Sequence, residues 1–360
     1  MEQNIKKSTI FLATGGSGGH IFPSLAVAEK LKEEGYNTCI LADSVYTKYS
    51  KKGVNYRIID ATKKLKTFSD IKKIFNGFLQ AKYFIKRKKP KLVISFGSYA
   101  TLPTLLACLW TKTPFILHEQ NAYIGKINKL FVKFSKKIMT TYHELYGIKF
   151  DDMNKMIYTG SPVRDEIVKN YNNEYKYPKA NEKFNILITG GSAGAKIFSE
   201  FLPKVFDEKH KKQQEKIKIF HQVREEYLKE VQDYYNKIEL DAVVSTFFIN
   251  MAELLKNSNL IIGRSGSGTL CETAVSGKPS ILIPLKTSAN NHQEVNARNF
   301  ERNGASIVVL ESELNIEEFR DVLFNLIKDE KKLKSMAENA KNLAVINSKE
   351  NIFNVIKEFL

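Results

Sequence analysis

Three glycine-rich stretches are the part of this sequence best suited to chemistry. They are "GGSGG" at 15–19, "GGSAG" at 190–194 and "GRSGSG" at 263–268, and each follows a short apolar run and precedes a helical pattern. Glycine at such a turn lets the backbone approach a ligand, and the helix start offers unpaired N–H groups to an anion. One such stretch could be a tight turn without a ligand, but three together predict binding of a phosphate-bearing molecule.

The common nucleotide fingerprints fit these stretches poorly. None of them has the spacing GxxxxGK[ST], which argues against a P-loop kinase or ATPase. The first resembles GxGxxG only loosely, and Asp43 is the candidate for the acidic residue that binds ribose in dinucleotide-binding domains. A dinucleotide-dependent oxidoreductase therefore remains an alternative.

Polar side chains also gather where apolar strand patterns end, in "ILHEQN", "TGSPVR" and "SANNHQEVNA". Many amides and hydroxyls at the carboxyl ends of parallel strands suit a ligand rich in hydroxyl groups, such as a sugar. Capping and turn chemistry explains each cluster equally well when it is taken alone. His20 stands at the start of the first helix and is a candidate base, although a capping role is the plainer interpretation.

Glu272 falls about one turn inside the helix that follows the third glycine stretch. A carboxylate there can accept hydrogen bonds from both hydroxyls of a ribose while the helix start faces a diphosphate. The helix dipole by itself also favours an acidic residue near a helix start.

Strand and helix patterns alternate along the whole chain and position these residues. "STIFLAT" and "NTCILA" are typical of strands, with a helix over about 24–34 between them, and the alternation restarts at "FNILITGG" after a polar connection. Such alternation predicts parallel sheets covered by helices. We expect an α/β fold of two Rossmann-like, doubly wound parallel-sheet domains that face each other across a cleft. The expected domains are residues 1–163 and 164–340, with a final helix in 341–360 that packs back on the first domain.

Composition sets the class of protein. With 360 residues, 43% of them hydrophobic, the chain can build two globular domains. Its charge of +17 favours anionic partners, although a lysine-rich genome would explain part of the excess. Three cysteines without paired or metal-like spacing indicate a reducing compartment and no structural zinc. Neither a signal peptide nor a membrane span is expected, and a cytosolic protein that can touch a membrane fits best.

The most basic stretch, residues 63–89, also has an apolar stripe. On a helix, one broad face collects Phe68, Ile71, Ile74, Phe75, Phe78 and Ile85, with lysines around it. Such a stripe is often core, but it could also be a surface helix that dips into an anionic bilayer. Nucleic acid would explain the charge too, but no RNA-binding motif is interleaved with the lysines, and no nucleic-acid partner is expected.

Seven motifs in one order carry a resemblance to a known family. "TGGSGGHIFPSLAVA", "HEQN", "GSPVR", "GGSAGA", "FINMAEL", "RSGSGTLCE" and "NHQEVNA" resemble those of the MurG family, bacterial N-acetylglucosaminyltransferases of peptidoglycan synthesis. The resemblance covers nearly the whole chain and implies a GT-B fold. It implies inverting transfer of N-acetylglucosamine from UDP-N-acetylglucosamine to the C4 hydroxyl of the muramyl-pentapeptide lipid pyrophosphate called lipid I, forming lipid II. It also implies a peripheral enzyme at the cytoplasmic face of the cell membrane, with no metal and no cofactor.

The resemblance also implies roles for individual residues. Those expected to bind UDP-N-acetylglucosamine are Ser17, Gly18, Gly19, Asn121, Arg164, Ser192, Ile249, Ser267, Gly268, Thr269, Leu270, Cys271, Glu272, Gln293 and Asn296. Among these, Glu272 would hold the ribose, Ile249 the uracil, and Gln293 and Asn296 the transferred sugar. Tyr99, His118 and Asn128 would lie on the acceptor side.

Two questions stay open at this level. His20 is the first candidate for the base that accepts the proton of the incoming hydroxyl, and Glu119 is the second. The loop "GSYATLP" departs from the family pattern GGYVSxP, because Ser98 replaces a glycine and Thr101 replaces a serine. That loop is expected to meet the acceptor diphosphate. Another lipid acceptor such as diacylglycerol, or a nucleotide-sugar binding protein without turnover, therefore remains an alternative.

Overall fold

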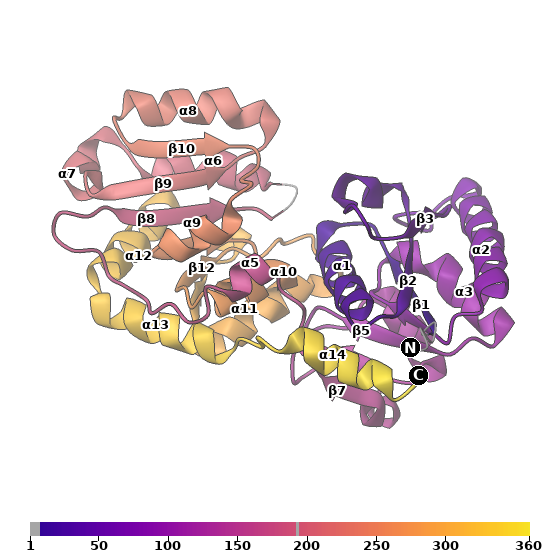
Figure 1. Cartoon of the computed structure of the whole chain (residues 1–360). Coiled ribbons are helices and arrows are strands. Elements are labelled where there is room, and N and C mark those ends of the chain that lie inside the picture. The colour runs from indigo at the N-terminus through magenta and orange to yellow at the C-terminus, as the bar shows by residue number, and fades with distance from the viewer. Residues whose placement is uncertain (1–7, 192–193) are drawn as a thin grey trace. The chain divides into compact units, whose positions relative to one another are not determined.

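A computed structural model describes residues 8–191 and 194–360 and divides into two compact units (Figure 1). The first unit contains the chain up to Arg164 together with Val345–Leu360, and the second contains Asp165–Ala344. Arg164 thus belongs to the first unit, and residues 341–344 belong to the second, so the boundaries lie a few residues from those expected. Each unit is a Rossmann-like α/β domain with a parallel sheet, as the sequence predicts.

The described part of the first unit is built on a seven-stranded parallel sheet with the order β3-β2-β1-β4-β5-β6-β7. Its strands are β1 (Thr9–Thr14), β2 (Asn37–Ala42), β3 (Tyr56–Ile58), β4 (Leu92–Ser95), β5 (Phe115–Glu119), β6 (Ile138–Thr140) and β7 (Met156–Tyr158). Its helices are α1 (Gly18–Glu33), α2 (Phe68–Lys88), α3 (Leu102–Thr111), α4 (Lys126–Phe131) and α14 (Ser348–Lys357), with short 3₁₀ turns η1 (Ser44–Tyr49), η2 (Tyr99–Thr101), η3 (Val132–Phe134) and η4 (Phe150–Lys155).

The inner strands β1, β4, β5 and β6 are buried on both faces, which is why they read as continuous apolar runs. One face packs against α2, α3 and α4, and the other packs against α1 and α14. The chain reaches α14 only after completing the second unit, and Figure 1 shows this last helix in yellow near α1. Lys30 on α1 pairs with Glu350 on α14 at 2.8 Å, and the Asn351 amide donates to the Thr159 carbonyl.

Helix α1 begins earlier than the sequence pattern suggests, at Gly18 instead of about residue 24. The glycine-rich turn therefore ends at Ser17, and Pro23 lies inside the helix. A proline disfavours a helix interior because it has no N–H to donate and its ring crowds the preceding turn. That preference misplaced the expected start. The cost is tolerated here in the second turn of α1, where the buried Ile21 and Leu25 anchor the helix on the sheet.

The described part of the second unit repeats the architecture with a six-stranded parallel sheet, β10-β9-β8-β11-β12-β13. Its strands are β8 (Phe184–Thr189), β9 (Ile217–Gln222), β10 (Asp241–Ser245), β11 (Leu260–Gly263), β12 (Ser280–Leu282) and β13 (Ser306–Val308). Its helices are α5 (Asp165–Val168), α6 (Lys196–Val205), α7 (Lys211–Gln214), α8 (Leu228–Lys237), α9 (Met251–Asn257), α10 (Ser267–Val275), α11 (His292–Arg302), α12 (Ile316–Lys328) and α13 (Glu330–Asn342), with 3₁₀ turns η5 (Glu208–His210), η6 (Glu225–Tyr227), η7 (Ala289–Asn291) and η8 (Glu311–Glu313).

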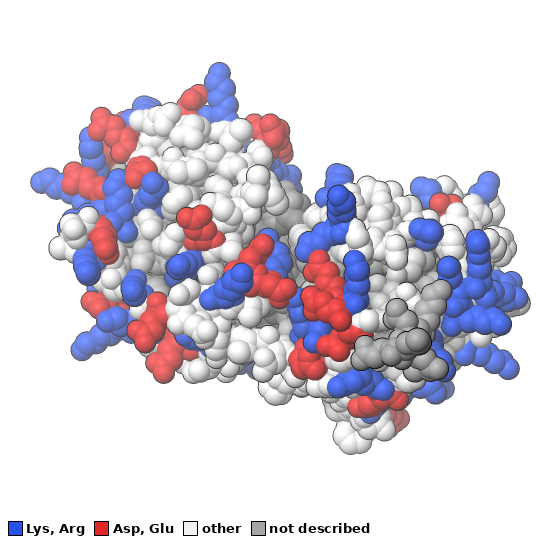
Figure 2. Space-filling model, in the orientation of Figure 1, with Lys and Arg blue, Asp and Glu red and all other residues white. Residues whose placement is uncertain are grey.

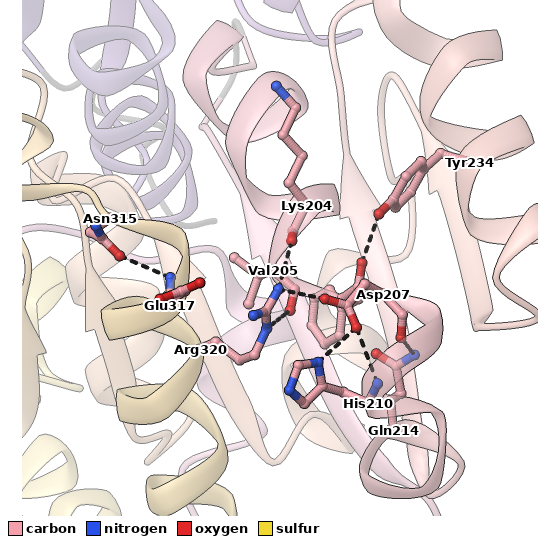
Figure 3. Close-up of polar contacts among 10 residues, drawn as sticks. Lys204, Val205, Asp207, His210, Gln214, Tyr234, Asn315, Glu317 and Arg320 are labelled. Atoms are coloured by element: carbon pink, nitrogen blue, oxygen red, sulfur yellow. Dashed lines mark hydrogen bonds and ion pairs between the residues drawn. The ribbon is translucent and has the colours of Figure 1, made fainter.

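A polar cluster in this unit holds the end of α6 against α12 (Figure 3). Arg320 donates to the Val205 carbonyl at 2.8 Å and to the Asp207 carboxylate at 2.8 Å, and Asp207 also accepts from the His210 ring at 2.7 Å. The last carbonyls of a helix have no intrahelical partner, and a cation near them is favoured by the helix dipole. The cluster therefore has a structural explanation.

Candidate functional site

The first glycine-rich turn follows β1 and is braced from behind by Asp43. Gly16 has φ +78° and donates its N–H to the Asp43 carboxylate at 3.1 Å. A Cβ on Gly15 would stand 2.7 Å from the same carboxylate and 2.6 Å from the Ala100 side chain. Asp43 is thus buried and already in use as an acceptor inside the protein. This differs from the arrangement in dinucleotide-binding domains, where the corresponding acid must reach a ribose.

The start of α1 is open in contrast to the buried turn before it. Ser17 is the N-cap residue, yet its side chain makes no capping hydrogen bond, and both Ser17 and Gly19 are exposed. The nearest atom to a Cβ built on Gly19 is the Ser17 hydroxyl oxygen at 3.7 Å. The first N–H groups of a helix have no partner within the helix, so this exposed start can donate to an anionic or polar ligand.

His20 has a defined orientation in the first turn of α1. Its Nδ1 lies 2.8 Å from the Phe96 carbonyl oxygen at the end of β4. A carbonyl can only accept, so Nδ1 carries the hydrogen and the neutral ring has its lone pair on Nε2. The side chain is half-buried. The hydrogen bond to Phe96 therefore selects the tautomer in which Nε2 of the neutral ring can accept a proton.

Glu119, the second candidate base, is buried, and both of its carboxylate oxygens already accept hydrogen bonds. One carboxylate oxygen accepts the Asn121 N–H at 3.1 Å, and the other accepts from the Gly125 N–H at 2.9 Å and the Asn128 amide at 2.8 Å. Only 1% of Glu119 is exposed. These donors stabilise the ionised carboxylate and leave little of it for a substrate, so Glu119 holds the "HEQN" turn together.

The remaining first-unit candidates lie at the carboxyl ends of β4 and β5, which neighbour each other in the sheet. His118 is fully buried, and burial lowers its pKa to about 4, so it stays neutral. Asn128 is buried as well, and its amide nitrogen also donates to the His118 carbonyl at 3.2 Å. Tyr99 is half-buried in η2.

The loop that departs from the family pattern is strained at the substituted position. Ser98 has φ +76° and ψ 155°, a backbone conformation that residues other than glycine rarely adopt. Its hydroxyl oxygen accepts from the Ala100 N–H at 3.3 Å and would stand 2.4 Å from a Cβ on Gly16. Thr101 keeps the hydroxyl of the expected serine and donates it to the Ser98 carbonyl at 2.9 Å.

In the second unit, the turn after β8 is held by Gln222, a residue that the sequence reasoning missed. The Gln222 amide donates to the Gly191 carbonyl at 3.0 Å and accepts from the Thr189 hydroxyl at 2.8 Å. Its position directly at the end of β9 follows the same strand-end rule that pointed to "HEQN" and could have found it. Ser192, expected at the diphosphate, lies outside the described residues.

The third glycine-rich turn leads into α10, and there is free space beside two of its glycines. A Cβ on Gly266 or Gly268 would meet no atom within 4 Å. Glu272 is half-buried, one turn further along the helix. Behind the turn, the buried Arg264 donates to the Ile283 carbonyl at 2.9 Å and pairs with Glu311. Thr269 is half-buried, and Ser267 and Leu270 are buried.

Gln293 and Asn296, expected at sugar hydroxyls, make hydrogen bonds to neighbouring loops. The Asn296 amide donates to the Ser265 carbonyl at 3.1 Å, and the Gln293 side-chain oxygen accepts from the Leu285 N–H at 3.0 Å. Asn296 is fully buried. The Asn296 side chain therefore fixes the turn before α10, and the Gln293 side chain fixes the loop after β12.

Two further candidates lie apart from these clusters. Ile249 is 88% exposed in the loop between β10 and α9. The Arg164 guanidinium lies over the Phe22 ring on α1, 5.8 Å from its centre. The structure thus brings Arg164 to the helix that carries His20, within the first unit.

The basic segment 63–89 forms α2, and its apolar residues divide between two faces. Ile74 and Ile85 are buried on the sheet, so the predicted single face is partly core. The adjoining face forms what we call the α2 surface, whose exposed apolar residues are Phe68, Ile71, Phe75 and Leu79 together with Trp110 of α3. Lys82 lies over the Trp110 ring at 4.7 Å. In Figure 2, blue side chains gather over the edge where Figure 1 places α2, and red ones lie over α1 and α14.

Within residues 8–191 and 194–360, no helix has both the length and the apolar character needed to cross a bilayer. The same residues contain no group of three or more His, Cys, Asp or Glu that could hold a metal ion.

Two parallel α/β units, each with glycine-rich turns at strand ends, are the architecture of GT-B glycosyltransferases. The model of the glycosyltransferase family 28 N-terminal domain matches residues 10–140, and that of the family 28 C-terminal domain matches residues 185–352. These matches cover most of the chain, and the chain belongs to glycosyltransferase family 28.

Two relatives from different bacteria carry the same name. The chain is 32% identical over 354 residues to the UDP-N-acetylglucosamine–N-acetylmuramyl-(pentapeptide) pyrophosphoryl-undecaprenol N-acetylglucosamine transferase of Caulobacter vibrioides, covering 96% of this chain and 98% of the relative. It is 34% identical over 350 residues to the transferase of that name from a Wolbachia of Drosophila simulans, with the same coverage. The crystal structure of Acinetobacter baumannii MurG superposes with a TM-score of 0.78 at 27% identity, covering 98% of this chain and 99% of that one.

Proposed function

We propose that this enzyme transfers N-acetylglucosamine from UDP-N-acetylglucosamine to the C4 hydroxyl of lipid I, forming lipid II. The observation that carries the proposal is the His20 imidazole, held with its Nε2 lone pair available beside an open helix start. It stands in a chain whose relatives, matched over 96% of its length, are named for this transfer.

The proposed reaction is a direct displacement with inversion. The acceptor O4 attacks C1 of the sugar, the bond between C1 and the diphosphate oxygen breaks, and its electron pair leaves with UDP. The proton of the C4 hydroxyl goes to Nε2 of His20, because Glu119 already accepts hydrogen bonds from three residues. Charge that develops on the diphosphate can be stabilised by oriented N–H groups at a helix start.

We assign the nucleotide to the second unit. The open start of α10 suits the diphosphate, with Ser267, Gly268, Thr269, Leu270 and Cys271 in its first turns and Glu272 placed to hold the ribose. We assign the uracil to the exposed Ile249. We assign Ser17, Gly18, Gly19 and Asn121 of the first unit to the transferred sugar, with Tyr99, His118 and Asn128 supporting the acceptor side.

The donor assignment is tested by calorimetry with UDP. The variant Glu272→Ala should weaken UDP binding about tenfold or more, because hydrogen bonds to a charged group contribute roughly 1.5–3 kcal/mol each. Glu338→Ala, which removes an exposed glutamate on α13, is the matched control. Equal affinity of Glu272→Ala and wild type for UDP would contradict the ribose assignment.

The transfer itself is tested with a short-chain lipid I analogue and UDP-N-acetylglucosamine, with diacylglycerol as the competing acceptor. We expect product from lipid I alone, and a fall in kcat of about 10²–10⁴-fold for His20→Ala with donor affinity retained. Turnover of diacylglycerol instead, or tight donor binding with no turnover of either acceptor, would overturn the proposed acceptor.

We further propose that the α2 surface attaches the enzyme to an anionic membrane at the cytoplasmic face. Its exposed aromatic and aliphatic side chains can enter the headgroup region, and Lys72, Lys82 and Lys86 stand among them on the helix. Each basic residue near an anionic bilayer contributes about 1 kcal/mol. An acceptor held by its lipid tail requires an enzyme that can reach the bilayer surface.

A further inference from the structure

A chain of hydrogen bonds runs behind His20 into the first unit. The His20 Nδ1 lies 3.0 Å from the side-chain oxygen of Gln120, in addition to its contact with the Phe96 carbonyl. The amide nitrogen of Gln120 lies 3.0 Å from His118 Nδ1, and His118 Nε2 lies 3.2 Å from the Gly160 carbonyl. The chain therefore begins at the proposed base and ends at a backbone carbonyl.

Only one placement of hydrogens satisfies every member of this chain. The Phe96 and Gly160 carbonyls can only accept, so His20 carries its hydrogen on Nδ1 and His118 carries its hydrogen on Nε2. His118 Nδ1 is then an acceptor, which requires the amide nitrogen of Gln120 on that side and the amide oxygen on the side of His20. If the Gln120 amide were flipped, its NH₂ group would face the Nδ1–H of His20, and two donors would meet without an acceptor.

The surroundings bury two of the three side chains in this chain of hydrogen bonds and give the nearby charged groups other partners. Gln120 and His118 are both buried, and burial holds the pKa of His118 well below that of an ordinary histidine. The nearby charged groups have other partners, since Glu119 faces the Asn121–Asn128 turn, Asp43 faces Gly16, and Arg164 lies over Phe22. Of the three side chains, His20 is the one that is half-buried instead of buried.

We propose that Gln120 is a positioning residue for the transfer reaction, fixing the tautomer and basicity of His20 through its side-chain oxygen. This inference rests on the proposed function, in which His20 is the base. When Nε2 takes the proton of the incoming hydroxyl, the Nδ1–H stays in place and its two oxygen partners stabilise the cation. Because the partner is a neutral amide, the ring gains less basicity than a carboxylate in that position would give it.

The test replaces Gln120 in two opposite ways. Gln120→Met keeps the side-chain volume and removes the oxygen, whereas Gln120→Glu places a negative charge beside His20. NMR titration of the His20 imidazole should show a midpoint lower by about 0.5–1 pH unit in the first variant and higher by more than about 1 unit in the second. The acid limb of kcat/KM should move with it.

The kinetic constants separate positioning from donor binding. In Gln120→Met, we expect kcat to fall about tenfold with KM for UDP-N-acetylglucosamine unchanged, since the loss of one hydrogen bond acts on the base. Gln213→Glu, an exposed glutamine on α7, is the matched control and should leave both the titration and kcat unchanged. A His20 midpoint that stays fixed, or that moves in the same direction in both variants, would overturn the proposal.

The wild-type protein gives a second measurement that needs no variant to fold. Nitrogen NMR of the imidazole rings at neutral pH should show hydrogen on Nδ1 of His20 and on Nε2 of His118, and the opposite tautomer at either ring would refute the chain. Opposite midpoint shifts in a protein that fails to transfer sugar would refute the proposed function and support the positioning. Normal sugar transfer with an unchanged His20 midpoint in both variants would support the proposed function and refute the positioning role of Gln120.

Discussion

Replacing Glu119 by glutamine distinguishes a base from a structural carboxylate. In the structure the carboxylate accepts from two backbone N–H groups and from the Asn128 amide, and it is buried. A glutamine can keep its oxygen toward Gly125 and Asn128, but its NH₂ group then faces the Asn121 N–H. The fold thereby loses a hydrogen bond to a charged group, about 1.5–3 kcal/mol, and gains a buried donor without an acceptor, about 1–3 kcal/mol.

A neutral amide is cheaper to bury than a carboxylate, which offsets part of this cost. We therefore expect Glu119→Gln to destabilise the first unit by about 2–4 kcal/mol, a fall in Tm of roughly 4–16 °C for a unit of this size. Differential scanning calorimetry of the full chain measures this shift.

The matched control is Glu33→Gln, an exposed position on α1, which should leave the transition unchanged. At a temperature where Glu119→Gln is folded, the acid limb of its pH–rate profile should still be present, because His20 remains. An unchanged Tm together with the loss of that limb would refute this reasoning and make Glu119 the base.

Three further outcomes follow from the structure. Ser98→Gly should be more stable than Ser98→Ala by about 1 kcal/mol in urea unfolding, because both lose the hydroxyl and only glycine relaxes at φ +76°. Burial opposes ionisation of Asp207, but the His210 hydrogen bond and the Arg320 charge hold its pKa below the ordinary value of 3.8. Asp207→Asn should therefore cost roughly 1 kcal/mol of stability at pH 7, and this cost should shrink as the pH falls below 3.8 and the wild-type carboxylate takes up a proton. Phe75→Ser should weaken binding to phosphatidylglycerol vesicles about tenfold or more, with Val243→Ser on β10 as the exposed control.

Periodicity and glycine placement were enough to predict the two α/β domains, because parallel strands buried on both faces leave continuous apolar runs in the sequence. The polar clusters were predicted by the same logic, since the carboxyl ends of neighbouring strands meet at one edge. The start of α1 was misplaced because proline disfavours a helix interior and local preference does not show what the rest of the helix packs against. The apolar stripe of α2 divides between core and surface, the two interpretations that the sequence left open, because spacing alone does not show how much of a stripe the sheet covers.

Sequence by itself determined the strand-to-helix turns, the family and the set of polar residues around them, since these depend on local spacing. Only the tertiary structure decided what each polar group does. Asp43, Glu119 and Gln120 are equally polar in sequence, yet Asp43 braces a turn, Glu119 is saturated by three donors, and Gln120 joins two histidines. The reason is physical: a hydrogen bond is set by distance and direction in space, and its partners here lie on strands that are far apart along the chain.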